Sequence, residues 1–359
     1  MWPYWLLFLV PAYFAITRLR PASAVGRLPK RWPGWWRAVF LLLVLMVGLR
    51  HQVGGDWLTY VEHITMASYE TLSGAISQGD PAYGLLNWLA ARYGLGPYFV
   101  NTVCAVIFSW GLVVFCQAQP RPWLALVVAM PYLVTVVAMG YTRQGTAIGL
   151  AMLALASLSE RRLLRFVVFV VLAATFHKSA VILMPLAVLA GTKRKLWTAC
   201  WVGLSTVLFY GLLLQDSVEA LTLNYIGAQY DSSGAAIRVA MNAVPAALFL
   251  WFRRGFVMSQ ADRMFWSWMS VIALAFVGLL VVSPSSTAVD RVALYWIPLQ
   301  LFVFSRLPDA LSKRNTRRGI LVGWVVAYSA TVLFVWLVFA THAYAWLPYQ
   351  FYPWVALWQ

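Results

Sequence analysis

Long apolar segments separated by short polar gaps make up this chain, and the alternation restricts the fold strongly. Hydrophobic residues account for 62% of its 359 residues, whereas charged residues account for only 11%. A helix of about 20 apolar residues crosses the hydrocarbon core of a bilayer. The pattern therefore predicts an all-α, polytopic integral membrane protein.

The charged residues are distributed unequally over the gaps. Five basic clusters recur in alternate gaps: Arg18–Arg37, Arg161–Arg165, Lys193–Lys195, Arg253–Arg263 and Arg306–Arg318. Because loops rich in Lys and Arg stay in the cytoplasm, we assign these gaps, together with Arg121, to the cytoplasmic side. They hold 21 of the 27 basic residues and three of the 11 acidic ones, so the two sides carry +18 and −2. The net charge of +16 thus indicates orientation and contact with anionic membrane lipids, and no nucleic-acid partner is expected.

The sequence has no motif that predicts a metal site or a cofactor. Neither a C-x-x-C nor an H-E-x-x-H pattern is present. Three cysteines, Cys104, Cys116 and Cys200, lie within apolar segments, where packing is their expected role. The first segment precedes its basic residues and has no evident cleavage site, so it is interpreted as a retained span rather than a signal peptide.

We expect about twelve transmembrane or re-entrant helices in a single polytopic domain, 1–359, with both termini on the non-cytoplasmic side. The predicted spans are 2–17, 36–50, 98–117, 122–140, 143–159, 163–176, 179–191, 196–214, 236–252, 264–283, 288–305 and 319–341. Two long outer loops, 51–97 and 215–235, and one basic cytoplasmic loop, 18–37, connect them. In the first outer loop, Trp57–Tyr69 and Tyr83–Tyr93 have the spacing of amphipathic helices. The aromatic tail, 342–359, is expected at the membrane interface.

The apolar pair at 163–191 is too short for two full crossings. Each half has about thirteen residues, whereas a span needs about 20, and basic residues flank both ends. The turn at His177 and Lys178 would then lie below the outer surface, buried in protein or lining a wet cavity. The alternative is a single kinked helix with His177 packed in the bundle.

Several residues on the sparsely basic outer side have no role in orientation. They are Arg50, Arg143, Lys178, Arg238 and Arg291. Arginine is costly in hydrocarbon unless it is paired or hydrated, so this set predicts an anion site. Arg291 has an alternative role, a local interaction with adjacent Asp290. Asp56, with Tyr60 one turn later, follows two glycines; its alternative role is as a plain helix cap.

Phosphate oxygens are the anionic groups that arginine recognises best, through paired hydrogen bonds. Several arginines can neutralise a diphosphate without a divalent metal. No D-x-D pair or glycine-rich phosphate loop is present, so ordinary nucleotide binding is unsupported. A lipid-linked diphosphate at the outer membrane surface fits the pattern best.

These residues also occur in motifs that resemble those of the EpsG-like, Wzy-type exopolysaccharide and O-antigen polymerases. The matching elements, in order, are Arg50…Val53-Gly54-x-Asp56…Tyr60, Asp80-Pro81-x-Tyr83-Gly84-Leu85-Leu86, Arg143-Gln144, Phe176-His177-Lys178-Ser179-Ala180 with Pro185, and Arg291…Tyr295. They extend over roughly residues 50 to 300. Asp80 stands where such proteins more often have glutamate.

The resemblance implies a glycosyltransferase of the bacterial inner membrane with its active side facing the periplasm. Such an enzyme transfers a growing glycan from undecaprenyl diphosphate to another lipid-linked repeat unit, without a metal. Arg143, Arg238 and Arg291 would stabilise the leaving diphosphate. His177 or Asp56 would be the base, unless Asp56 orients the acceptor sugar. Further substrate-binding residues would be Arg50, Tyr60, Gln144, Lys178 and Tyr295, and a chain-length regulator is a candidate partner.

Two other membrane activities fit the same features. A flippase for the lipid-linked glycan would need a cationic cavity, although transporters commonly have repeated halves and a site near mid-membrane. A ligase would move the finished glycan to a lipid or protein acceptor with nearly the same chemistry. Phenotype separates them, because loss of a flippase removes all surface glycan and loss of a polymerase leaves a single repeat unit. A membrane acyltransferase or a purely structural role explains the outer bases less well.

Overall fold

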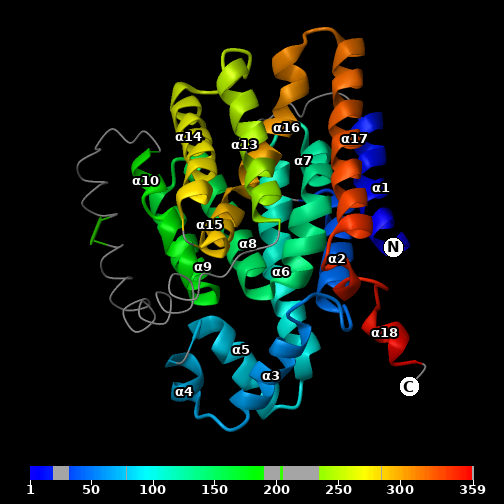
Figure 1. The fold of residues 1–359 in the computed structure, drawn as a ribbon, viewed down its shortest axis with the longest axis vertical. Coiled ribbons are helices and arrows are strands. Elements are labelled where there is room, and N and C mark those ends of the chain that lie inside the picture. The colour runs from blue at the N-terminus through cyan, green and yellow to red at the C-terminus, as the bar shows by residue number, and fades with distance from the viewer. Residues whose placement is uncertain (19–31, 78, 190–202, 205–233, 284, 358–359) are drawn as a thin grey trace.

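The computed structural model describes residues 1–18, 32–77, 79–189, 203–204, 234–283 and 285–357. These residues form a bundle of helices with a small helical layer at one end (Figure 1). Within these ranges there is no β-sheet. One isolated antiparallel β-bridge joins Arg50 to Phe351 in these ranges. The expected all-α class is therefore correct for the described residues.

Among the described residues, five helices are long and apolar enough to cross a membrane: α6 Gly96–Gln117, α13 Ala235–Phe252, α14 Gln260–Val282, the segment Ser286–Leu311 and α17 Asn315–Phe339. The segment Ser286–Leu311 consists of α15 Ser286–Ala293, the 3₁₀ turn η5 Leu294–Trp296 and α16 Ile297–Leu311. Shorter apolar helices are α1 Trp2–Thr17, α2 Gly34–Gly48, α9 Leu163–Phe176 and the segment Pro122–Ala138. The count of twelve spans and the side of the termini stay predictions, and the expected span 196–214 lies almost wholly outside the described residues.

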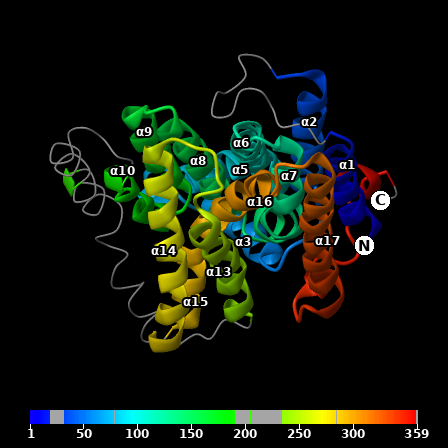
Figure 2. The same ribbon diagram turned by 90° about the horizontal axis from the view of Figure 1, so that it is seen from above.

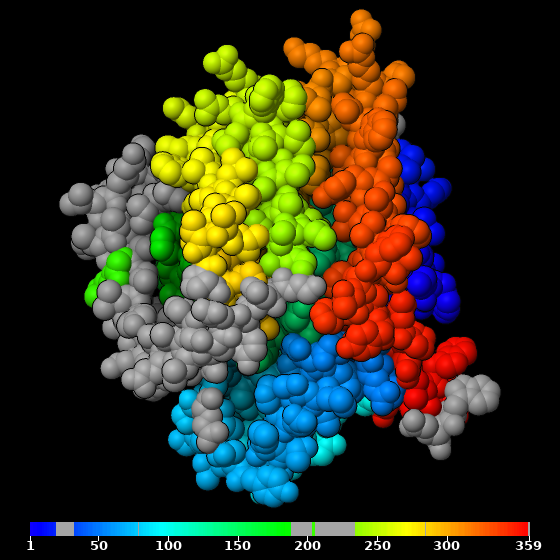
Figure 3. All heavy atoms as spheres, in the orientation of Figure 1, coloured from blue at the N-terminus to red at the C-terminus, as the bar shows by residue number. Residues whose placement is uncertain are grey.

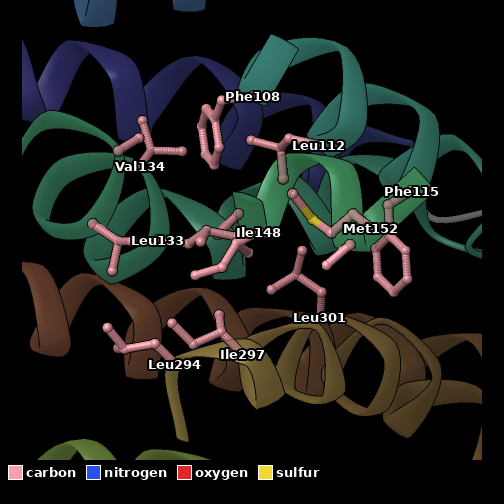
Figure 4. Packing of buried hydrophobic residues seen from close by; sticks show 14 of the residues in the cluster. Phe108, Leu112, Phe115, Leu133, Val134, Ile148, Met152, Leu294, Ile297 and Leu301 are labelled. Carbon is pink, nitrogen blue, oxygen red and sulfur yellow. The ribbon is translucent and has the colours of Figure 1, made fainter. Parts of the chain in front are cut away.

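The central helix of the bundle is α8, Thr142–Ser159, which is buried along nearly its whole length. It packs on α6 and α9, and Figure 2 places it inside the outer helices. Gly149 makes the α6 contact close, because a Cβ there would lie 2.6 Å from the Cα of Phe108. Small residues permit such approaches between membrane helices. Apolar side chains of α6, α8, η1 and α16 complete this core (Figure 4).

A π-helix precedes α8. Helix α7, Pro122–Ala129, continues as η1, Met130–Ala138, and the chain then reverses at Tyr141 before α8 begins. A wide helical turn alters which backbone carbonyls are paired within the helix, and π-helices are frequent near functional sites. The carbonyl of Thr135 in η1 accepts a hydrogen bond of 2.7 Å from the indole of Trp346.

The C-terminal segment packs against the bundle along part of its length, and its expected place at the membrane interface stays a prediction. Trp346 is buried, and its carbonyl accepts a hydrogen bond from Tyr4 in the first turn of α1. His51 donates its backbone N–H to Gln350, and Tyr352 donates to Leu49. Trp346 thus packs between α1 and η1, whereas Tyr344 and Trp354 of the same segment are 75% and 68% exposed.

At one end of the bundle, Arg121 meets the basic cluster Arg306–Arg318. Arg121 makes two hydrogen bonds of 2.8 Å to Asp309, which also forms an ion pair with Arg318 at 3.4 Å. Arg306 donates to Gln119 beside this pair. These contacts join the turn before α7 to the turn between α16 and α17.

The first outer loop folds into three helices at the opposite end, below the bundle in Figure 1. They are α3 Trp57–Ala67, α4 Leu72–Ser77 and α5 Pro81–Arg92. Two of them match the expected amphipathic helices, and α4 is additional. Helix α5 contacts α6 and α9, which places the loop against the start of α8. The second expected outer loop, 215–235, lies outside the described residues apart from its last two positions.

Candidate substrate site

The start of α8 is the point where the predicted functional residues converge. Asp56 and Tyr60 come from α3, Asp80 from the start of α5, and Arg143 and Gln144 from the first turn of α8. The turn after α9 supplies His177 and Lys178. Helix α15 and η5 supply Arg291 and Tyr295, and α13 supplies Arg238.

Arg50 lies behind this site as a buried structural link. Its side chain is 0% exposed and donates to the carbonyls of Val47 and Val53. It also donates to Asn101 of α6 at 3.2 Å and to the hydroxyl of Thr142 at 2.6 Å. A buried guanidinium needs several acceptors, and this one finds them in α2, α6 and α8. It therefore holds the first turn of α8 in place.

Asp56 and Tyr60 contact that same turn from the outer layer. The hydroxyl of Tyr60 accepts from the backbone N–H of Thr142 at 3.0 Å and lies 3.5 Å from an Asp56 carboxylate oxygen. Asp56 precedes α3, but its side chain makes no capping hydrogen bond, so the plain-cap alternative is wrong. Burial raises the pKa of Asp56, and the positive charges of Arg291 and Arg143 oppose that shift. The carboxylate is thus within electrostatic range of both arginines.

Asp80 joins α8 to the turn after α9. One carboxylate oxygen accepts from Arg143 at 3.0 Å, and the other accepts from the backbone N–H of Lys178 at 3.0 Å. Burial raises the pKa of Asp80, whereas the Arg143 charge and the bond from Lys178 lower it. Arg143 also lies over the ring of Tyr83, with its guanidinium carbon 5.7 Å from the centroid. Its side chain nevertheless stays 37% exposed.

His177 lies at the break between α9 and a 3₁₀ segment, η2 Lys178–Leu183. Its extended backbone ends α9, which contradicts the alternative of one kinked helix through this position. After η2, the short helix α10, Leu186–Leu189, contacts α9 again. The imidazole Nδ1 lies 3.0 Å from the Ser179 hydroxyl, which lies 3.2 Å from the buried Tyr295 hydroxyl. These contacts tie the turn to η5.

The two late arginines are arranged differently. Arg238 forms a paired ion pair with Asp290, with both hydrogen bonds at 2.7 Å. Asp290 is therefore engaged by α13, and the alternative of a local Asp290–Arg291 pair is wrong. Arg291 faces the ring of Tyr141, with its guanidinium carbon 5.8 Å from the centroid. The side-chain amide of Gln144 donates to the Arg291 carbonyl at 2.6 Å and fixes this turn against α8.

His63 belongs to this cluster and was not singled out from the sequence. Its ring packs between Tyr60 and Tyr83, with centroids 6.2 and 6.3 Å away. Its buried Nδ1 has no hydrogen-bond partner among the described residues. Burial and the charge of Arg143 lower its pKa. The available signal was its position three residues after Tyr60, on the same face of a helix.

The geometry favours an anion site with a carboxylate beside it. Arg143 and Arg291 carry the charge, and Asp56 lies within range of both. Among the described residues, no group of three His, Cys, Asp or Glu side chains is placed to hold a metal ion. Cys104 and Cys116 are buried and unpaired by disulfides, and Cys200 lies outside the described residues.

The fold and this cluster define a multi-pass helical membrane protein with a polar, arginine-bearing site at one end of its bundle. Residues 35–351 match the EpsG family, and the chain belongs to that family. This membership indicates an exopolysaccharide-polymerase-like membrane protein and a glycosyltransferase of the polysaccharide polymerase type. The matched range contains every site residue named above. No curated protein and no solved structure gives a match.

Proposed function

We propose that this protein polymerises undecaprenyl-diphosphate-linked oligosaccharide repeat units on the periplasmic face of the bacterial inner membrane. The supporting observation is the convergence of Asp56, Arg143 and Arg291 at the start of α8. Asp56 is linked to that turn through Tyr60 and Thr142, and the carbonyl of Arg291 is bonded to Gln144. The two guanidinium groups would bind the diphosphate of the donor. Asp56 would lie beside the anomeric carbon, where an acceptor hydroxyl arrives.

In this reaction the acceptor oxygen forms a bond to the anomeric carbon. The bond between that carbon and the diphosphate oxygen breaks, and its electron pair leaves with the lipid diphosphate. The hydroxyl proton passes to a base, for which Asp56 and His177 are the candidates. Arg143 and Arg291 favour the transition state because negative charge develops on the leaving oxygen.

The remaining predicted residues divide by their contacts. Tyr60, Gln144 and Tyr295 are buried and engaged with the protein, so their proposed role is to position the reacting groups. Arg50 and Arg238 have the same role, because each is bonded to neighbouring elements rather than directed only toward a ligand. Lys178 contributes positive charge near Asp80. Membrane lipids and a chain-length regulator are further proposed partners.

The test is the surface-glycan ladder from a strain that lacks the gene. The strain is complemented with wild type, Arg143→Ala or the control Arg92→Ala, which removes an exposed base of α5. We expect the ladder from wild type and the control, and a single-repeat band from Arg143→Ala. Loss of all glycan in the deletion strain would indicate a flippase or a ligase. An unchanged ladder in that strain, with no second polymerase, would overturn the proposal.

A further inference from the structure

An apolar groove runs between α13 and α17, beside the candidate site. Its volume is about 550 Å³, and its floor includes Tyr132 of η1. Helix α13 packs on α14, α15 and α16, whereas α17 packs on α7, η1 and α16. The two helices therefore belong to different sides of the groove, and Figure 3 shows inner green atoms between them. The described residues that form its apolar walls are Ile237, Met241, Val244, Val332, Val335 and Phe339.

One end of the groove is polar and meets the site. Arg238 lines the groove and bonds to Asp290, which directly precedes Arg291. Tyr132 lies close enough to Arg238 and Asp290 to interact electrostatically with both. Its hydroxyl is buried and has no hydrogen-bond partner among the described residues. A donor in this position fits a ligand that brings an oxygen atom to the groove entrance.

Away from Arg238, the walls of the groove are mainly apolar. From Gly234, the N-cap of α13, to Val244 the wall rises about 15 Å, which is ten steps along an α-helix. That is about half of the hydrocarbon thickness. Several wall residues stay exposed, including Ile237 at 65% and Phe339 at 69%. A long apolar chain whose polar end lies at the site would cover them.

We propose that this groove binds the first isoprene units of the polyprenyl chain, while the attached diphosphate lies at Arg143 and Arg291. This inference rests on the proposed function, which supplies a lipid diphosphate as substrate. The groove would align the scissile bond, because a chain held between α13 and α17 fixes the direction from which the diphosphate enters. In this arrangement the Arg238–Asp290 ion pair lies at the boundary between the polyprenyl chain and the diphosphate.

Groove filling provides the test. Val335→Trp places a large ring in the groove, and Val338→Trp is its control, because both valines lie on α17 and are 44% exposed but only Val335 lines the groove. The purified full-length variants, in nanodiscs of phosphatidylglycerol, are titrated with undecaprenyl diphosphate and with geranyl diphosphate. We expect Val335→Trp to weaken undecaprenyl diphosphate binding about tenfold or more, as expected if a few buried methylene groups are displaced. Binding of geranyl diphosphate should change less, and Val338→Trp should bind both as wild type does.

Several outcomes would overturn the inference. Equal affinity of Val335→Trp and wild type for undecaprenyl diphosphate would exclude the groove while leaving the proposed function intact. If wild type bound neither diphosphate, the proposed function itself would fail. A smaller change, Val335→Phe, keeps the comparison valid if Val335→Trp does not fold.

Discussion

Arg121 and Arg143 occupy similar positions relative to their helices but differ in burial and in how they are hydrogen-bonded. Each lies at the start of a bundle helix, and each pairs with an aspartate far away in the sequence. Arg121 is 3% exposed and makes two hydrogen bonds of 2.8 Å to Asp309. Arg143 is 37% exposed and makes one of 3.0 Å to Asp80. The first geometry locks two loops together, whereas the second keeps charge and donors accessible.

The comparison distinguishes a structural arginine from a ligand-binding one. A guanidinium that forms a paired bond in a buried position has little left to offer a ligand. A half-exposed guanidinium held by one bond is aimed by its partner and still available to phosphate oxygens. By the same criterion, Arg238 resembles Arg121, and Arg291, which faces an aromatic ring, resembles Arg143.

The largest expected effect comes from Asp56, the carboxylate within electrostatic range of Arg143 and Arg291. Asp56→Asn should lower kcat/KM by about 10²–10⁴-fold, the range for loss of a general base. Burial raises the pKa of Asp56, so wild-type activity should fall as pH decreases through that raised value, because the base must be ionised. The variant should lack this acid limb. The control Asp309→Asn, at the opposite end of the bundle, should keep the acid limb of the pH profile. An unchanged pH profile in Asp56→Asn would indicate that His177 is the base.

Arg143→Ala should lower kcat by about 10²–10³-fold, because it removes a donor to the developing charge of the leaving group. Its folding stability should fall only modestly, because Arg143 is 37% exposed and Asp80, at 9% exposure, keeps its hydrogen bond from the Lys178 N–H. Activity in a reconstituted assay and thermal unfolding in the same detergent give the two readouts. A large loss of stability with normal activity would place Arg143 in the structural class.

Arg121→Ala should show the reverse pattern. Removing one partner of a largely buried pair should destabilise the protein by about 2–3 kcal/mol, less than for a fully buried pair because Asp309 is 24% exposed. Activity per folded molecule should be unchanged. Thermal unfolding and activity normalised to folded protein measure this, and the double variant Arg121→Ala with Asp309→Ala should recover part of the loss.

Lysine substitutions should give the smallest effects and sharpen the distinction. Arg143→Lys keeps the charge but loses the planar pair of donors, so we expect an activity loss of about tenfold. Arg121→Lys should leave activity unchanged and lower stability by about 1 kcal/mol. Equal activity losses in both variants would mean that the two arginines do not differ in function.

Helix positions and motif residues followed from the sequence because their signals are local. An apolar run ends where polar residues begin, so the expected spans 2–17 and 163–176 coincide with α1 and α9. The motif residues lie at the starts of α3 and α8 and just after the end of α9. They meet because these helix ends lie at the same end of the bundle. The EpsG family resemblance was confirmed by the match over residues 35–351.

Tertiary structure alone decided which partner each polar group has. Asp290 bonds to Arg238 across 52 residues rather than to its neighbour Arg291, and Asp80 joins two elements at positions 143 and 178. Trp346 packs between α1 and η1, a position that the local sequence does not reveal. Local patterns carry no information about such pairs, because a hydrogen bond depends on the direction and distance that packing creates between segments far apart in the chain. Composition and periodicity determined the helices, and helix packing determined the site.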